Sequence, residues 1–278
     1  MEGIDVQNLP QITLVVPCFN ESPHILAESL GSVARQNYRN FECLVIDEST
    51  DPASTHSAAA ICNSDPRFRH IIPTRRLGLA GSLNLGISQA RGEFIARFDS
   101  DDVCLPDRLS LQLDWMNKNP LVDVLGGGLE IIDRKGNTLA FRDYPLDHKA
   151  ISRRFHRTTA VAHPTVLMRT AALKAVGGYD PQFRFAEDLD LWLRMLNCGI
   201  RFANLPQTLV KYRQNNTNRN SDHWRYNLRA RRKNFTRSNI MGRLIGIGLI
   251  GTWLYTPSFL QKLVFRMALL RSKQKVTT

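Results

Sequence analysis

Hydrophobic and polar positions alternate in blocks along the first half of the chain, and the blocks predict a repeated strand-helix pattern. Four short runs are almost continuously apolar or β-branched, and we expect each to form a strand: residues 11–17, 41–47, 68–73 and 93–99. The longer runs between them have the mixed spacing of helices, and they cover 22–36, 51–64 and 78–92. Strands without polar alternation are typical of a parallel sheet with helices on both faces, so the predicted class is α/β.

The second half of the chain is less regular, but its apolar spacing still predicts distinct elements. A helix is expected to begin near Pro106, followed by a strand at 122–128 and a hairpin that turns at Gly136-Asn137. Residues 186–199 carry an amphipathic pattern, because four apolar side chains share one helical face: Leu189, Trp192, Leu193 and Leu196. In sheets built from repeated strand-helix units, ligands collect beyond the carboxyl ends of the strands.

The stretch ARFDSDDVCLP, residues 96–106, places three carboxylates directly behind an apolar strand. Asp99, Asp101 and Asp102 would repel one another and raise each other's pKa unless a cation or hydrogen-bond donors compensate them. Two carboxylates spaced Asp-x-Asp can share a divalent ion, and hard oxygen ligands suit Mg²⁺ or Mn²⁺. Capping of the next helix is the structural alternative, but it needs one carboxylate rather than three. The cluster therefore predicts a metal site.

Composition and charge narrow the class of protein. The chain has 278 residues, 43% of them hydrophobic, which is enough for one large domain with an appendage. Its five cysteines form no C-x-x-C pair, so they indicate reduced thiols and no structural zinc site. The net charge of +12 comes entirely from the end of the chain, where 12 Lys and Arg residues and no Asp or Glu follow residue 222. We therefore expect a neutral body, residues 1–222, and a basic C-terminal region, residues 223–278.

The basic C-terminal region contains an uncharged run, residues 244–260, with Arg-rich segments on both sides. The run is shorter than the roughly 20 apolar residues of a spanning helix, and it contains glycines and Pro257. Its basic flanks, with Trp253 and Tyr255, favour a helix that lies in the headgroup plane of an anionic membrane. A helical hairpin packed on the protein, a dimer surface and a spanning helix are the alternatives.

Five motifs follow one another in the order found in a known family: VVPCFNES, VIDEST, GLAGSLNLGISQARGEFIARFDSDD, HPTVLMR and AEDLDLWLRM. Over about residues 10–215, this ordered set resembles the family 2 glycosyltransferases. The resemblance implies a GT-A fold for the body, which is a Rossmann-like, mainly parallel mixed sheet flanked by helices. It also implies transfer of a sugar from a nucleotide-diphosphate donor with Mn²⁺ or Mg²⁺ and inversion at the anomeric carbon.

The resemblance assigns donor-side roles to residues in three loops. Asp47 would accept hydrogen bonds from the base or the ribose, although DEST stands where DDGS is common, so that Glu48 departs from the pattern. Asp99 would contact the ribose or the metal, Asp101 would be the principal metal ligand, and Asp102 would be a supporting carboxylate. The other residues implied at the nucleotide are Pro17, Asn20, Glu21 and Ser100.

Asp188 is the predicted general base. Inversion requires a carboxylate on the acceptor side of the anomeric carbon, where it takes the proton of the attacking hydroxyl. The resemblance places this base at the Asp of a Glu-Asp pair that opens a helix, as Glu187-Asp188 does here, and we group Glu187 with the donor site. The structural alternative is that acidic residues in a first helical turn complement the helix dipole.

Three further positions are candidates for donor contacts. His163, followed by Pro164, would lie near the donor sugar, or it is a structural histidine. Arg213, in KYRQNN, would face the diphosphate, or it is a surface charge. One of Arg75 and Arg76 would place a cation near the base or the phosphates, and we select Arg76.

Together these observations predict a metal-dependent, inverting glycosyltransferase. It would move a hexose or N-acetylhexosamine, with a UDP-sugar favoured, to a glycan or lipid-linked acceptor in cell-surface polysaccharide or lipopolysaccharide synthesis. The first residues lack the pattern of a signal peptide, so we expect a cytoplasmic protein held on the inner face of the cell membrane. A retaining transferase, a nucleotidyltransferase and a catalytically silent sugar-binding relative are the alternatives. Nucleic acid is not an expected partner, because the body is neutral.

Overall fold

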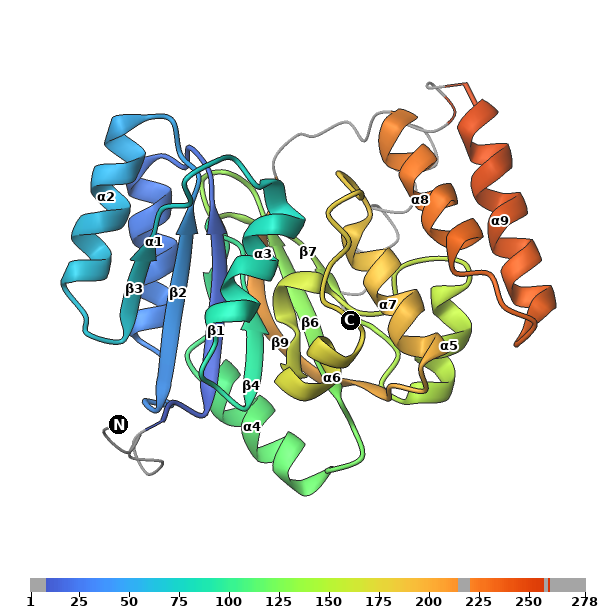
Figure 1. The fold of residues 1–278 in the computed structure, drawn as a ribbon, viewed down its shortest axis with the longest axis horizontal. Helices are drawn as coiled ribbons and strands as arrows, with labels where there is room; N and C mark the ends of the chain where they lie inside the picture. Colours follow the sequence, from blue (N-terminus) through green and yellow to red (C-terminus); the bar gives the residue numbers. More distant parts are fainter. Residues whose placement is uncertain (1–8, 215–220, 258–259, 261–278) are drawn as a thin grey trace.

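The computed structural model describes residues 9–214, 221–257 and 260, in which a mixed sheet is flanked by helices (Figure 1). The strands are β1 (Ile12–Cys18), β2 (Phe41–Asp47), β3 (Phe68–Ile71), β4 (Phe94–Arg97), β5 (Val103–Cys104), β6 (Val124–Ile132), β7 (Thr138–Arg142), β8 (Leu167–Arg169) and β9 (Phe202–Arg213). The α-helices are α1 (Pro23–Ala34), α2 (Pro52–Asn63), α3 (Gly78–Gln89), α4 (Arg108–Lys118), α5 (His148–Phe155), α6 (Thr170–Ala175), α7 (Glu187–Asn197), α8 (Ser221–Lys233) and α9 (Ile240–Tyr255). A 3-10 turn, His163–Thr165, precedes β8.

The strands lie in the order β3-β2-β1-β4-β8-β6-β9-β5, and β7 pairs with β6. β1 is parallel to β2 and β4, and β2 is parallel to β3, whereas β8 is antiparallel to both of its neighbours. The predicted parallel half of the sheet and its three helices are therefore confirmed. Because β1, β2 and β4 are parallel neighbours, their carboxyl ends share one edge, and the loops that follow them meet there.

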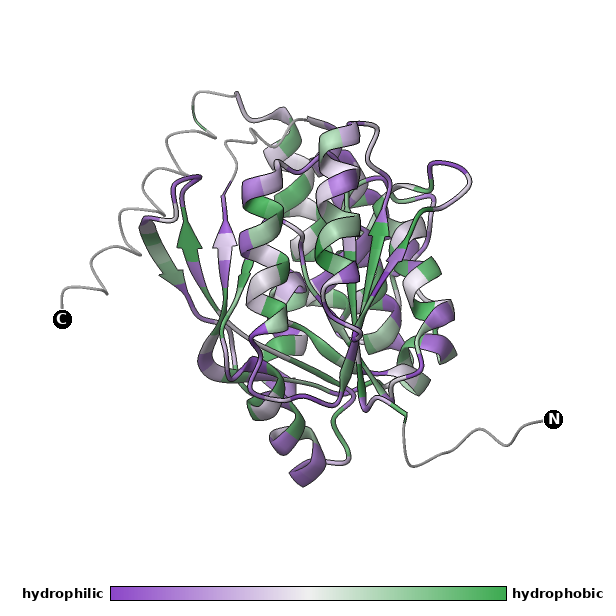
Figure 2. Cartoon of the chain, turned by 90° about the vertical axis from the view of Figure 1, so that its left-hand side faces the viewer, coloured by the Kyte–Doolittle hydropathy of each residue, from purple (hydrophilic) through white to green (hydrophobic). Residues whose placement is uncertain are grey.

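Two apolar cores hold helices on opposite faces of the sheet. Leu14 and Val16 of β1 belong to a cluster with α1, α2 and α4, whereas Val15 between them belongs to a cluster with α3, α5 and α7. In Figure 2 the strands behind the foremost helices are mostly hydrophobic, and those helices carry both hydrophilic and hydrophobic residues. Because both faces are covered, the strands read as continuous apolar runs in the sequence.

The second half of the sheet differs from the prediction. β9 was not predicted, because its 12 residues, FANLPQTLVKYR, mix polar and apolar positions without a period. It pairs in parallel with β6, which runs on past the predicted strand 122–128 to Ile132. The two strands approach closely at Gly126, where a Cβ would lie 2.4 Å from Asn204 Oδ1. This pairing carries the end of β9 to the loop between β4 and β5.

α8 and α9 form a helical hairpin that packs on the body, as one of the alternatives anticipated. The buried Arg231 donates to the carbonyl oxygens of Phe155 and His156, at 2.8 and 2.6 Å. At Gly246 of α9 a Cβ would lie 1.6 Å from the same His156 oxygen, so α9 sits directly on the end of α5. No helix within the described ranges is long and apolar enough to cross a membrane. The division of the chain at residue 222 stays a prediction.

Candidate active site

A cavity of about 290 Å³ opens at the carboxyl edge of the sheet, where the loops after β1, β2 and β4 meet the start of α3. It is lined by Pro17, Cys18, Phe19, Glu21, Glu48, Arg76, Gly78, Leu79, Ser82, Asp99, Ser100 and Asp101. Half of these were predicted at the nucleotide or the metal: Pro17, Glu21, Arg76, Asp99, Ser100 and Asp101. Residues from four separate loops therefore share one cavity because the strands before them are neighbours.

Like charges crowd the floor of this cavity. Burial raises the pKa of Asp101 to about 7, and repulsion from Asp99 and Glu21 adds to the rise. Burial and the neighbouring Asp99 also raise the pKa of Glu21. Among the described residues, no three His, Cys, Asp or Glu side chains are arranged to hold a metal by themselves. The carboxylates fit a cation, provided that a ligand such as a diphosphate completes its coordination.

A buried arginine, which the sequence analysis overlooked, lies behind the carboxylates. Arg97 is 4% exposed, and its Nη1 donates to an oxygen of Asp99. The Nε atom of Arg97 has no hydrogen-bond partner among the described residues. The sequence contained a signal for this residue, because Arg97 lies in the apolar strand EFIARFD, and a charge in a strand that is buried on both faces needs a partner. Arg97 fixes one oxygen of Asp99 and supplies positive charge beneath the cluster.

Arg213 ties the acidic loop to the rest of the fold. It is 4% exposed, so it is not a surface charge. Its backbone N–H donates to Asp102 Oδ1 at 2.8 Å, and its Nε donates to the carbonyl oxygen of Asp101 at 2.8 Å. Its Nη1 reaches the carbonyl oxygens of Asp133 and Arg134, and its Nη2 reaches Glu28. A contact with the donor stays a prediction, and the observed bonds give Arg213 a positioning role.

Glu48, where the sequence departs from the family pattern, closes the start of α3. Its Oε2 accepts hydrogen bonds from the backbone N–H groups of Leu77 and Gly78, at 2.8 and 3.1 Å, and its Oε1 accepts one from Ser82 Oγ. A carboxylate is favourable at a helix N-terminus, because it satisfies free N–H groups and opposes the dipole. Glu48 thus holds the loop that presents Arg76, whose guanidinium lies 4.0 Å from the Phe19 ring centre.

Asn20 and Asp47 are not among the residues that line the cavity. Asn20 has a left-handed backbone, with φ of 54°, and its Oδ1 accepts hydrogen bonds from the N–H groups of Thr50 and Asp51. Asp47 is 1% exposed, and its carboxylate contacts His70 Nε2 and the N–H of Ser49, both at 2.9 Å. Neither side chain lines the cavity, so contacts between them and a nucleotide stay predictions.

The predicted base lies at the start of α7. The preceding Ala186 has φ of 57°, a strained value for a residue with a Cβ, and strain of this kind is common at functional sites. Asp188 is half-buried, and its Oδ1 accepts a hydrogen bond from the N–H of Leu189 at 2.7 Å. Burial, then repulsion from Asp188, raises the pKa of Glu187 to about 8, and Asp99 contributes to the rise. Glu187 therefore lies within electrostatic reach of the donor-side cluster.

His163 is buried against aromatic rings. Its Nε2 shares a 2.8 Å hydrogen bond with the hydroxyl of Tyr179, and its ring lies edge-on to Trp192 at 5.8 Å. Burial holds the pKa of His163 well below its usual value, and the nearby Arg97 lowers it further. His163 is therefore neutral, and its predicted contact with the donor sugar stays a prediction.

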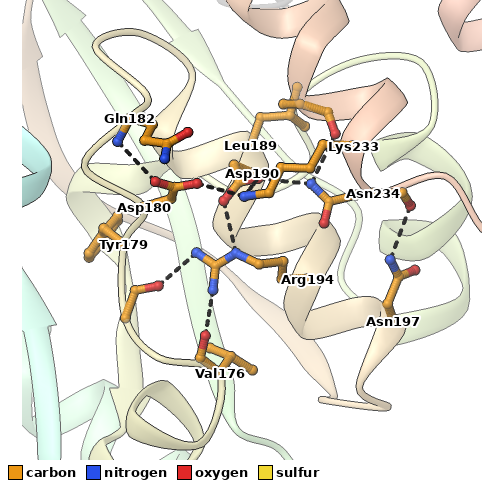
Figure 3. A network of polar contacts seen from close by, with 12 residues as sticks. Val176, Tyr179, Asp180, Gln182, Leu189, Asp190, Arg194, Asn197, Lys233 and Asn234 are labelled. Atoms are coloured by element: carbon orange, nitrogen blue, oxygen red, sulfur yellow. Dashed lines mark hydrogen bonds and ion pairs between the residues drawn. The ribbon is translucent and has the colours of Figure 1, made fainter.

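Charged residues farther along α7 are fully paired, as Figure 3 shows. The carboxylate of Asp190 is completely buried and accepts hydrogen bonds from Arg194 Nε, Lys233 Nζ and Asn234 Nδ2, at 2.8, 3.1 and 2.9 Å. Arg194 also donates to the carbonyl oxygen of Gly178 at 2.7 Å. The network joins α7 to the loop after α6 and to the end of α8, so it holds the helix that carries Asp188.

Comparisons with known proteins agree in the kind of protein that they match. A family model described as Glycosyl transferase family 2 matches residues 13–177, more than half of the chain. An uncharacterized glycosyltransferase of Methanocaldococcus jannaschii is 30% identical over 206 residues, which cover 73% of this chain and 71% of that protein. The O-antigen biosynthesis glycosyltransferase WbnJ of Escherichia coli is 34% identical over 192 residues, 68% of this chain and 74% of that protein.

Solved structures of TarS from S. aureus have a similar fold. One superposes with a TM-score of 0.65 at 20% sequence identity over 85% of this chain, and the match spans 42% of that longer chain. The complex of TarS 1-349 with UDP-GlcNAc superposes with a TM-score of 0.62 at 20% identity, over 80% of this chain and 66% of that chain.

Proposed function

Because this chain belongs to glycosyl transferase family 2 and is a glycosyltransferase of GT-A fold, we propose that it moves a hexose or N-acetylhexosamine from a UDP-sugar to a hydroxyl, with inversion. The acceptor in this proposal is a glycan or lipid-linked saccharide of a cell-surface polysaccharide or lipopolysaccharide. Two of the comparisons support these finer points. WbnJ is named for O-antigen biosynthesis, and TarS was crystallised with UDP-GlcNAc.

One observation carries the proposal: Glu187, the neighbour of Asp188 at the start of α7, is close enough to Asp99 of the carboxylate-lined cavity for the charge of Asp99 to raise its pKa. In the proposed reaction the acceptor oxygen attacks the anomeric carbon, and the bond from that carbon to the diphosphate oxygen breaks. Asp188 takes the hydroxyl proton, and the nucleoside diphosphate leaves with the bonding electron pair. Inversion follows because attack and departure occur on opposite faces of the sugar.

Asp99 and Asp101 are the proposed holders of Mn²⁺ or Mg²⁺. Their fit rests on the crowding of like charge, which raises the pKa of Asp101 to about 7. When bound, the ion supplies positive charge next to the leaving diphosphate. Arg97 orients Asp99 from below, and Arg213 holds the main chain of Asp101 and the carboxylate of Asp102.

The remaining predicted residues divide into two groups in this proposal. Side chains that line the cavity supply the donor contacts: Pro17, Glu21, Arg76 and Ser100. Asn20, Asp47, His163 and Arg213 do not line the cavity, so their contacts with the donor stay predictions. Glu187 remains beside the donor, because its pKa responds to the charge of Asp99.

Thermal stabilisation by nucleotide sugars tests the proposal. UDP-, GDP-, dTDP- and CDP-sugars are each added with Mn²⁺, Mg²⁺ or EDTA, to the wild-type protein and to Asp101→Asn. We expect UDP-sugars to raise the melting temperature in the presence of a metal, and the Asp101→Asn variant to lose this shift. Absence of any shift, on protein that is folded by circular dichroism, contradicts the proposal.

Attachment to an anionic membrane surface is part of the same proposal. One face of α9 is exposed and carries apolar side chains with no charge: Ile240, Met241, Leu244, Ile245, Leu249 and Tyr255. Arg232 and Arg237 are exposed near its start, and the sequence after residue 260 adds five Lys or Arg and no acidic residue. Apolar area flanked by positive charge suits an anionic bilayer.

Cosedimentation with vesicles tests this attachment. The wild-type protein is expected to sediment with phosphatidylglycerol vesicles at low salt, and to stay in solution with phosphatidylcholine vesicles. Leu244→Asp with Leu249→Asp places charge on the exposed face and is expected to abolish sedimentation. Equal sedimentation of the double variant and the wild type contradicts the assignment of this face.

A further inference from the structure

Aromatic side chains gather between the loop that precedes α7 and the near ends of α8 and α9. Phe185 lies 5.9 Å from Tyr226 and 6.3 Å from His223, measured between ring centres. Trp224 lies 5.4 Å from His223 and 5.9 Å from Trp253. We call these five residues the aromatic cluster. Each of them keeps part of its surface exposed.

The aromatic cluster begins next to the predicted base. Phe185 precedes Asp188 by three residues, and the left-handed Ala186 turns the chain between them. Figure 1 shows the loop before α7, the start of α8 and the end of α9 at the same end of the molecule as the carboxyl edge of β1 and β2. The cluster therefore lies at the same end of the molecule as the cavity and the start of α7.

The exposed rings rest on a rigid support. The buried Phe183 lies 6.1 Å from Tyr226, and the guanidinium of Arg229 lies 5.0 Å from the Phe183 ring centre. Arg229 is itself fixed by two hydrogen bonds to Gln182, at 3.3 and 2.9 Å. Rings held in this way lose little freedom when a ligand stacks on them.

Packing of the hairpin alone does not account for the aromatic cluster. The hairpin is already fixed by the buried Arg231 and by the bonds of Asp190 to Lys233 and Asn234. Rings that served only as packing would be covered, whereas Phe185 and Tyr226 remain partly exposed. Partly exposed aromatic rings beside a reactive carboxylate are characteristic of ligand sites.

We propose that the aromatic cluster is the acceptor subsite and that its acceptor is a saccharide carried on a lipid, an inference that rests on the proposed function. The C–H face of a pyranose ring is apolar, so it can stack on Phe185 and Tyr226 while its hydroxyls point to Asp188. The lipid continues past Trp224 and Trp253 to the exposed apolar face of α9. A sugar without a lipid would make no contact with this apolar surface.

Exposed cations beside the rings fit the phosphate that joins such a sugar to its lipid. The guanidinium of Arg184 lies 5.8 Å from the Phe185 ring centre. On α8 the Arg225 side chain is 71% exposed and forms a 3.5 Å surface ion pair with Asp222, whose carboxylate a phosphate can replace. Planar guanidinium groups are well suited to phosphate oxygens. A carboxylate, aromatic rings, cations and an apolar face therefore lie on the adjoining segments α7, α8 and α9, and a lipid-linked saccharide has a group to match each of them.

Binding of simple glycosides tests the subsite without knowledge of the natural acceptor. The probes are the methyl and decyl β-glycosides of glucose, galactose and N-acetylglucosamine, below their micelle concentrations. Dissociation constants are measured by saturation-transfer NMR on the full chain, with UDP-sugar and Mn²⁺ present. We expect a decyl glycoside to bind at least about tenfold more tightly than its methyl counterpart, since each buried CH₂ is favourable.

Variants separate the parts of the subsite. Phe185→Ala and Tyr226→Ala are each expected to weaken binding of both the methyl and the decyl glycosides by about tenfold. Trp253→Ala is expected to weaken binding of the decyl glycosides only. Phe185→Leu and Tyr226→Leu keep apolar volume and serve if an alanine variant fails to fold. Phe141→Ala, an exposed ring on β7 outside the aromatic cluster, is the matched control and is expected to change neither constant.

Three results would overturn the inference: equal binding of methyl and decyl glycosides, unchanged binding in the Phe185 and Tyr226 variants, or no binding by any of the six probes. Metal-dependent thermal stabilisation by nucleotide sugars is recorded on the same samples. Stabilisation without glycoside binding means that the acceptor subsite is wrong and the proposed function stands. If nucleotide sugars do not stabilise the wild-type protein, the proposed function itself is wrong.

Discussion

Asp101 is half-buried in the cavity and Asp190 is completely buried, and the two regions around these carboxylates are built differently. Asp190 accepts hydrogen bonds from three donors and joins α7 to α8 (Figure 3). Asp101 has Asp99 and Glu21 as neighbours, and their repulsion adds to the effect of burial on its pKa. A buried charge with enough donors is compensated within the fold, whereas like charges gathered in a cavity are compensated when a ligand binds.

The same contrast recurs within one turn of α7, between Asp188 and Asp190. Asp188 is half-buried at the helix start, and Asp190 is completely buried two residues later. Substitution of Asp188 should therefore affect the catalytic rate, and substitution of Asp190 should affect the stability of the fold.

The largest effect is expected at Asp188. Asp188→Asn removes the proton acceptor and keeps the shape of the side chain, so kcat should fall by about 10²–10⁴-fold, as for other general bases. The melting temperature should stay close to that of the wild type. Steady-state transfer assays and thermal unfolding measure the two quantities, and a kcat near the wild-type value would remove Asp188 from the proposed mechanism.

At Asp190 the loss should fall on stability. Asp190→Ala removes the carboxylate shared by Arg194, Lys233 and Asn234, and losing hydrogen bonds to a charged group costs about 1.5–3 kcal/mol of unfolding free energy. Chemical denaturation measures this change. The kcat per folded molecule should fall far less than in Asp188→Asn, and a stability equal to the wild type would show that the network is dispensable.

A smaller effect, on pH dependence, is expected at Asp101. Its raised pKa of about 7 means that a metal must displace a proton below that pH, so affinity is lost as the pH falls through 7. Binding of Mn²⁺ with the stabilising nucleotide sugar should be about tenfold weaker at pH 6 than at pH 8. Isothermal titration calorimetry measures the affinity at each pH.

Asp101→Asn provides the control for this measurement. The variant should bind the metal and the nucleotide sugar weakly and with little change between pH 6 and 8, because the titrating carboxylate is gone. A wild-type affinity that is flat over the same range would contradict the assignment of Asp101 as a metal ligand.

The two regions also differ in how far the sequence could predict them. The cavity is made of short loops that follow strongly apolar strands, so the carboxylate pattern indicated Asp99 and Asp101, and the family resemblance indicated Glu21. The contacts of β9 and of the α8–α9 hairpin, in contrast, join residues far apart in the chain. No local pattern indicates that Arg213 bonds to the loop of Asp101, or that Lys233 meets Asp190.

Glu48 shows a second limit of sequence reasoning. Its departure from the common family motif was visible in the sequence. The role of Glu48 was not visible, because it accepts hydrogen bonds from the N–H groups of Leu77 and Gly78, which follow β3 and lie about 30 residues later in the sequence. A substitution inside a motif can only be interpreted once the residues that it faces are known.

The amide of Asn20 has a practical consequence for protein engineering. Its oxygen accepts hydrogen bonds from the N–H groups of Thr50 and Asp51, so it links the loop after β1 to the loop after β2. If only one of these loops were replaced with that of a relative, the hydrogen bonds between the two loops would be lost. Chimeras should exchange residues 17–22 and 47–54 together, as one cassette.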